Sequence, residues 1–149
     1  MSLYDTYSTD TAKEEQGVEF IYAGAAKLRI ARAGGANKRY QKAVERITKP
    51  YRTAIDRSRC PIETLRHLLM QAVAEACILD WHTHTRDTET GEYSWVPGIE
   101  GTDGTIVPVT AENMVALFKH LPDFFEEVQA DANAYGSFQE AGLEEDAKN

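Results

Sequence analysis

The chain has 149 residues, 42% of them hydrophobic, and a formal net charge of -8 at pH 7. This size and apolar content predict one domain with a single ordinary core. The two cysteines, Cys60 and Cys77, are too few for a disulfide framework and indicate a reduced, intracellular protein. Neither a signal-type leader nor an apolar run of roughly 18–20 residues is present, so we expect a soluble, unexported protein without a membrane span.

The N-terminal part predicts an arm followed by a β-hairpin. Residues 1–16, "MSLYDTYSTDTAKEEQ", are polar and lack periodicity, which is typical of a flexible arm. The β-prone runs "VEFIY" and "AKLRIAR" then follow, separated by "AGA". Their alternation predicts a hairpin that places these apolar residues on matching faces: Val18, Phe20, Tyr22, Leu28 and Ile30.

Two helices are expected next. Residues 37–49 combine an apolar stripe with Lys and Arg on the other face, Asn37 can cap the start, and Pro50 ends or bends the helix. The stretch "CPIETLRHLLMQAVAEACILDW" predicts the central core helix, with Pro61 in its first turn. Its expected apolar stripe is Ile62, Leu65, Leu69, Val73 and Ala76.

The rest of the chain predicts a loop and two more helices. Residues 82–109 lose periodicity and contain several glycines and prolines, so we expect a loop insertion with a small hairpin around "EGTDGT". Thr110 can cap "AENMVALFKHL", and Pro122 opens a helix whose apolar spacing runs from Phe124 to Tyr135. The expectation is an α+β fold over residues 17–142: a small N-terminal antiparallel hairpin or sheet, then about four helices, then a charged tail over 143–149.

Charge is divided unevenly along the chain. Residues 27–59 hold eleven Lys or Arg against two acids, a net +9, whereas residues 80–149 hold fifteen acids against three bases, a net -12. The overall excess of acid makes nucleic acid an unlikely partner, although a basic face can still contact phosphate. Two solvated faces of a monomer, or faces that meet head to tail in a ring or filament, both fit this division.

The stretch "DWHTHTRDTET" raises the question of a metal site. On a strand, His82 and His84 would project from one face and could share a metal with Asp80 or Glu89. The chain is too short for the large barrel hydrolases that use such a pair, and the glycines that frame a cupin motif are absent. The favoured interpretation is a polar loop, with no cofactor, no metal and no catalytic residue.

Several segments together resemble tail assembly chaperones of long-tailed, siphovirus-type bacteriophages. They are "GVEF", "AKLRIARAGGANKRYQKAVERITKPYR", "AEACILDW", "VTAENMVALFKHLPDFFEEVQADAN" and "EEDAKN", in that order, and the likeness covers about residues 17–149. The chain departs from the family in its insertion at 82–108, which is longer than the short turn expected after "LDW".

The resemblance implies a non-enzymatic assembly factor of the host-cell cytoplasm that is absent from the mature virion. Such proteins bind the long helical tape measure protein and help to recruit tail tube subunits. The partner-binding candidates are Lys38, Arg39, Lys42, Arg46, Arg52, Phe124 and Phe125. The alternatives are a nucleic-acid-binding module that uses helix 37–49 and, less favoured, a small metalloprotein centred on His82 and His84.

The ending "DAKN" carries a further implication of the resemblance, because relatives are often made in two forms through a programmed minus-one frameshift. A Lys-Asn pair can be encoded by a slippery run of adenines, which the protein sequence permits without demonstrating. The codons of residues 147–149 and the overlapping reading frame would decide between slippage and an ordinary charged end.

Overall fold

The computed structural model describes residues 2–140 and confirms the α+β class. The charged tail at 143–149 and the "DAKN" ending lie outside the described residues. No helix among residues 2–140 is long and apolar enough to cross a membrane. The helices are α1 (Leu3–Tyr7), α2 (Thr11–Gln16), α3 (Lys38–Thr48), α4 (Arg52–Asp56), α5 (Ile62–Ala76), α6 (Ala111–His120) and α7 (Pro122–Asn133), with 3-10 turns η1 (Lys49–Tyr51) and η2 (Tyr135–Phe138).

Four strands form one antiparallel sheet in the order β1-β2-β3-β4. They are β1 (Val18–Tyr22), β2 (Ala26–Ile30), β3 (Ile78–Arg86) and β4 (Tyr93–Pro97). The predicted β1–β2 hairpin is confirmed, with Phe20 opposite Leu28. A register shift at Arg29/Ile30 accommodates the extra residue Leu79 in β3.

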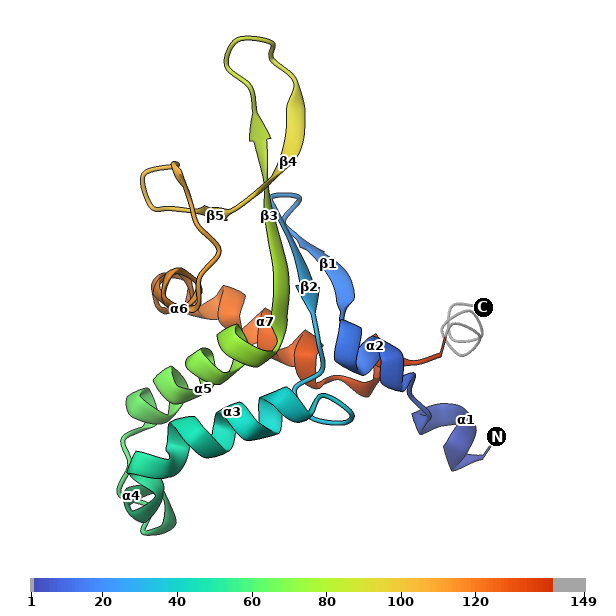
Figure 1. Ribbon diagram of the computed structural model, residues 1–149, viewed down its shortest axis with the longest axis vertical. Coiled ribbons are helices and arrows are strands. Elements are labelled where there is room, and N and C mark those ends of the chain that lie inside the picture. The colour runs from blue at the N-terminus through green and yellow to red at the C-terminus, as the bar shows by residue number, and fades with distance from the viewer. Residues whose placement is uncertain (1, 141–149) are drawn as a thin grey trace.

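The two faces of this sheet have different surroundings. Leu28, Ile30 and Trp81 point into a core that also contains apolar side chains of α5, α6 and α7. Strand residues whose side chains point to the opposite face of the sheet, such as Ile21 and His84, are exposed. Helices therefore cover one face and leave the other open, and the β3–β4 hairpin extends beyond the rest of the sheet (Figure 1).

Half of the expected loop insertion at 82–109 is strand, which corrects the prediction. Residues 82–86 continue β3 and pair with 93–97, while β5 (Ile99–Glu100) and β6 (Ile106–Val107) form the predicted small hairpin around "EGTDGT". The glycines of the segment occupy turns rather than breaking the strands. At Gly98, φ is +140°, and an added Cβ would lie 2.2 Å from Cγ2 of Ile106.

Helix α5 is the predicted core helix, and Val73 and Ala76 of its predicted stripe are buried, but the helix is shorter than predicted and the N-terminal part of the stripe is exposed. The helix ends at Ala76, because residues 78–86 pair with β2 and β4 instead. Ile62 and Leu65, expected in the buried stripe, are 76% and 39% exposed. The buried apolar residues of α5 are Leu68, Met70, Ala72, Val73, Ala74 and Ala76.

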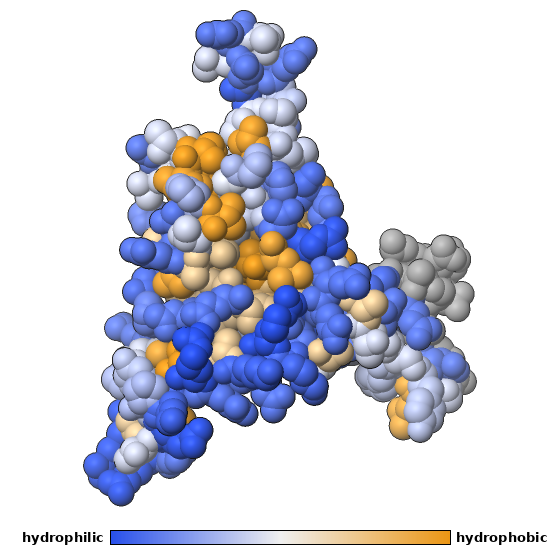
Figure 2. Space-filling model, viewed as in Figure 1, coloured by the Kyte–Doolittle hydropathy of each residue, from blue (hydrophilic) through white to orange (hydrophobic). Residues whose placement is uncertain are grey.

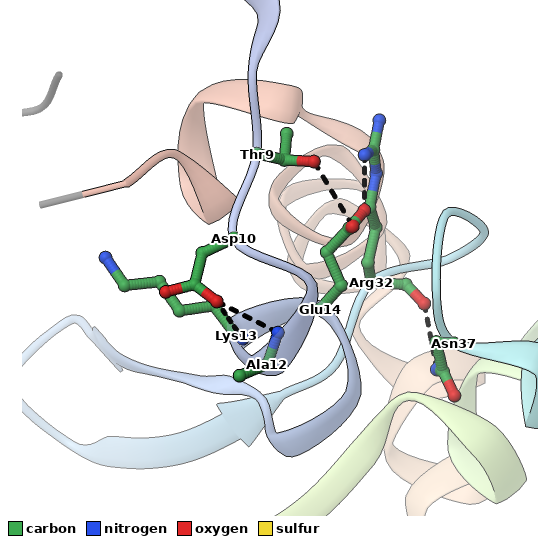
Figure 3. A network of polar contacts seen from close by, with 7 residues as sticks. All are labelled: Thr9, Asp10, Ala12, Lys13, Glu14, Arg32 and Asn37. Atoms are coloured by element: carbon green, nitrogen blue, oxygen red, sulfur yellow. Dashed lines mark hydrogen bonds and ion pairs between the residues drawn. The ribbon is translucent and has the colours of Figure 1, made fainter.

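The N-terminal segment, expected to be an arm without regular structure, forms the two short helices α1 and α2. Asp10 caps α2 by accepting from the backbone of Ala12, and Glu14 is buried (Figure 3). Glu14 Oε2 accepts from Arg32 Nη1 at 2.5 Å, and Thr9 Oγ1 donates to Glu14 Oε1 at 3.2 Å. The contact with Arg32 joins residues distant in the chain, so periodicity in the local sequence does not reveal it.

The C-terminal end of the described chain completes this N-terminal anchor. Thr9 forms an isolated antiparallel bridge with Gln139, and the Asp10 backbone N–H donates to the Phe138 carbonyl at 2.8 Å. Lys13 Nζ donates to the Gln139 carbonyl at 2.9 Å. The two ends of the described chain therefore hold each other beside the sheet, as Figure 1 shows near α2.

Candidate functional site

His82 and His84 lie on β3 rather than in a loop, which corrects that part of the interpretation. They project from the open face of the sheet, but their side chains have different partners. His82 Nδ1 lies 3.6 Å from Asp80 Oδ1, whereas His84 packs against the rings of Tyr93 and Trp95 at centroid distances of 5.2 and 4.8 Å. Within residues 2–140, no group of three or more His, Cys, Asp or Glu is placed to hold a metal ion.

We predict that replacing His82 and His84 together with Ala lowers Tm by no more than about 4 °C, because exposed cross-strand contacts contribute about 1 kcal/mol or less. The measurements are a thermal melt and metal analysis of the purified protein. The wild-type protein should contain no stoichiometric metal. Equimolar zinc, iron or nickel that disappears in the double variant would contradict this prediction.

The open sheet face carries a row of aromatic and cationic side chains that sequence analysis did not identify. Lys27 Nζ lies 4.9 Å from the centroid of the Trp95 ring, and the Arg86 guanidinium lies 5.9 Å from that of Tyr93. Together with His84 these residues form a continuous stack along the β3–β4 hairpin. The signal in the sequence was alternation over 82–86 and 93–97, which becomes visible only when both segments are assigned as strands.

The structure places the basic candidates along a projecting arm formed by α3, η1, α4 and the start of α5. Lys38, Arg39, Lys42, Arg46 and Arg52 are all exposed. Arg46 pairs with Glu75 of α5, and Arg39 donates to the Glu15 carbonyl at 2.6 Å. The surface over α3 and α4 is mostly hydrophilic in Figure 2. Lys42, Arg46 and Arg52 line one shallow hollow on this arm, together with Glu45 and Lys49.

The two phenylalanine candidates occupy different environments. Phe125 is 2% exposed and belongs to the core, so it cannot contact a partner in this conformation. Phe124 is only partly buried, with its ring centroid 5.2 Å from that of Tyr22 and 5.9 Å from that of Trp81. Helical spacing alone does not separate these neighbours, because both fit the apolar stripe of α7, of which Phe125, Val128 and Ala132 are buried.

Phe124 forms part of a groove of about 360 Å³ between the sheet, α6 and α7. Its apolar lining is Tyr22, Ala23, Ala25, Ala26, Trp81, Leu117, Leu121 and Phe124. Three carboxylates, those of Glu100, Asp123 and Glu127, also line it, together with Thr83. We call this feature the acidic-rimmed groove. An apolar floor with anionic edges suits a ligand that is apolar along one stripe and basic beside it.

A buried tyrosine stabilises the floor of the acidic-rimmed groove. Tyr22 Oη donates to Asp131 Oδ2 of α7 at 2.6 Å. Burial, with the hydrogen bond to Asp131 as a second cause, raises the pKa of Tyr22 far above its usual range. Tyr22 is therefore a neutral hydrogen-bond donor at physiological pH, which ties β1 to α7 on one side of the groove.

Two further titratable side chains, Cys77 and His67, have pKa values shifted by burial. Burial raises the pKa of the Cys77 thiol to about 12, so this fully buried thiol is not a nucleophile at neutral pH. His67 borders a second cleft of about 570 Å³ between α3, α5 and α6, where its Nε2 lies 3.0 Å from Gln71 Nε2. Burial, with nearby Lys119 as a second cause, lowers the pKa of His67, which keeps the imidazole neutral at pH 7.

Comparison with known proteins identifies the origin of the chain. The family model of the YdaY prophage protein matches residues 35–149, which include helices α3 to α5, strands β3 to β6 and helices α6 and α7. No curated protein and no solved structure matches the chain. A phage origin agrees with the resemblance in the sequence, while the family description specifies no role in tail assembly. Because the match covers well over half of the sequence, the chain belongs to the YdaY prophage protein family.

Proposed function

We propose that this phage protein is a tail assembly chaperone that binds an amphipathic helical segment of the tape measure protein. It works without catalysis in the host-cell cytoplasm, helps to recruit tail tube subunits, and is absent from the finished virion. The phage family and the resemblance over residues 17–149 support this role. The single observation that carries the proposal is the acidic-rimmed groove.

The groove has the chemistry that such a client requires. A long helical protein exposes apolar stripes that aggregate unless another surface covers them. Leu121 is half exposed at the junction of α6 and α7, and the partly buried Phe124 provides aromatic surface beside it, above the buried Trp81. The carboxylates of Asp123 and Glu127 lie on the first turns of α7, where they favour Lys or Arg next to the apolar stripe of the client.

The test is co-expression of the full chain with the tape measure protein of the same prophage. The wild-type chain should keep the tape measure protein in the soluble fraction, and Leu121→Ser combined with Asp123→Lys should reduce that soluble amount about tenfold. The reason is the loss of an exposed apolar contact and the reversal of one rim charge. The control is Ile21→Ser, because Ile21 is similarly exposed but lies on the open face of the sheet.

Two results would refute this assignment. One is a tape measure protein that stays insoluble with the wild-type chain, and the other is equal solubilisation by the groove variant and by Ile21→Ser. Circular dichroism of each variant alone establishes that the substitutions leave the fold intact. The altered residues are exposed, so a change in stability larger than about 0.5–1 kcal/mol is not expected.

Nucleic-acid binding is a second candidate function, favoured by the exposed bases of the arm. Lys38, Lys42 and Arg52 have no ion-pair partner among the described residues. Binding through these bases would make the affinity for duplex DNA fall steeply with salt. A fluorescence-anisotropy titration at several salt concentrations separates the two functions, because the groove assignment requires no affinity for DNA.

A further inference from the structure

We propose that, in the absence of a client, the end of the basic arm of one copy docks into the acidic-rimmed groove of a second copy. We define the arm tip as the exposed residues around η1 and the start of α5: Lys49, Tyr51, Arg52, Ile62 and Leu65. This self-association goes beyond the proposed function, because it requires neither a tape measure protein nor any other client. It makes the occupant of the groove a second copy of this chain.

The arm tip combines exposed apolar surface with positive charge that has no partner within the described chain. Ile62 is 76% exposed and Tyr51 is 41% exposed, although both are large apolar side chains. Lys49 and Arg52 are exposed and form no ion pair with any carboxylate in residues 2–140. These exposed apolar residues and bases lie at the same end of the arm, so that end offers both apolar surface and positive charge to a partner.

The acidic-rimmed groove complements the tip in both properties. Leu117, Leu121 and Phe124, which are partly or half exposed, provide an apolar surface of the kind that would cover Tyr51 and Ile62. Glu100, Asp123 and Glu127 provide three negative charges against Lys49 and Arg52. A nucleic acid would satisfy the bases of the tip but would leave its apolar side chains in water, so the tip as a whole fits the groove better than it fits a polyanion.

The tip and the groove are too far apart to meet within one chain. Helix α5 has 15 residues and rises about 1.5 Å per residue, so its two ends are about 22 Å apart. The tip lies at the N-terminal end of α5, whereas Trp81 of the groove follows its C-terminal end by five residues. Figure 1 shows α4 at the far end of the arm, away from the sheet, with α3 and α5 side by side.

Contact between two different patches is heterologous, so the copy that donates its tip keeps a free groove and its neighbour keeps a free tip for further copies. Such contacts close into rings or extend into filaments, depending on the rotation between neighbouring copies. They would also bring bases of segment 27–59, net +9, of one copy against carboxylates of segment 80–149, net -12, of the next. A client that fills the groove would compete with this contact and dissociate the assembly.

The test is sedimentation velocity of the full chain at low salt with two complementary charge reversals. The tip reversal is Lys49→Glu with Arg52→Glu, and the groove reversal is Asp123→Lys with Glu127→Lys. The wild-type chain should associate, with an apparent Kd that rises with salt. Each reversed protein alone should associate at least about tenfold more weakly, because like charges then meet at the contact.

Mixing the two reversed proteins in equal amounts should restore association, since each reversed tip then meets a groove of opposite charge. The control is Arg86→Glu with Lys119→Glu, which makes the same change in net charge as the tip reversal, away from both patches, and should leave association unchanged. A wild-type chain that stays monomeric at low salt overturns the proposal, as does a mixture that fails to associate. Neither result bears on the tape measure co-expression test, so the two proposals fail separately.

Discussion

Replacing Phe118 with Ala should destabilise the protein by about 3–5 kcal/mol, because the substitution empties the centre of an aromatic cluster. Phe118 is fully buried on α6, and its ring lies 4.9 Å from that of Phe125 and 6.1 Å from those of Trp81 and Phe124. Truncation removes these contacts and leaves a cavity that rigid neighbours only partly fill. A thermal melt should show Tm lower by roughly 10 °C or more.

The matched control for Phe118→Ala is Tyr93→Ala, which removes an aromatic ring that is 64% exposed on the β3–β4 hairpin. That substitution should cost less than about 1 kcal/mol. Because Phe118 contacts Trp81 and Phe124, its loss should also disturb the floor of the acidic-rimmed groove and weaken both proposed contacts there. Equal losses of stability in the two variants would show that the aromatic cluster is not the centre of the core.

Replacing Glu14 with Gln should destabilise the protein by about 2–3 kcal/mol, because the Arg32 guanidinium loses its counter-charge. The Glu14 side chain is 3% exposed and that of Arg32 is 23% exposed, so water only partly compensates. Gly35 is packed so closely that an added Cβ would lie 1.9 Å from Glu14 Oε2, which leaves little room for rearrangement. Urea unfolding should show a lower midpoint with an unchanged m-value.

Glu15→Gln provides the control for this substitution. Glu15 is adjacent in α2 and exposed, and its side chain has no ion pair among residues 2–140, so its replacement should change stability by no more than about 0.5 kcal/mol. If the Glu14→Gln and Glu15→Gln variants unfold at the same urea concentration, the ion pair between Glu14 and Arg32 does not contribute to the free energy of unfolding. A large difference would show that α2 is part of the cooperative unit.

Local patterns in the sequence were sufficient for several elements. The β1–β2 hairpin follows from alternation around Phe20 and Leu28, and α3 ends where Pro50 interrupts its ladder. Thr110 caps α6 and Pro122 starts α7 as expected. Each of these signals acts within a few residues, because capping, periodicity and proline geometry are properties of the local backbone.

Contacts distant in the sequence decided the elements that were missed. The stretch from Ile78 to Arg86 has a helix-like beginning, yet pairing with β2 and β4 makes it a strand and places His82 and His84 on an open face. The segment holding Glu14 looks like an unstructured arm until Arg32 and Gln139 are brought beside it. Strand pairing and buried ion pairs depend on partners elsewhere in the chain, which local propensity cannot specify.

The sequence by itself determined the α+β class, the hairpin, the boundaries of the helices around Pro50 and Pro122, and the opposite net charges of segments 27–59 and 80–149. Only the tertiary structure decided which apolar residues remain exposed. Ile62, predicted in the buried stripe, is exposed, whereas Phe125 is in the core. Phe124 and Trp81 both line the acidic-rimmed groove. The physical reason is that periodicity specifies the faces of an element, whereas burial depends on which neighbouring elements reach each part of that face.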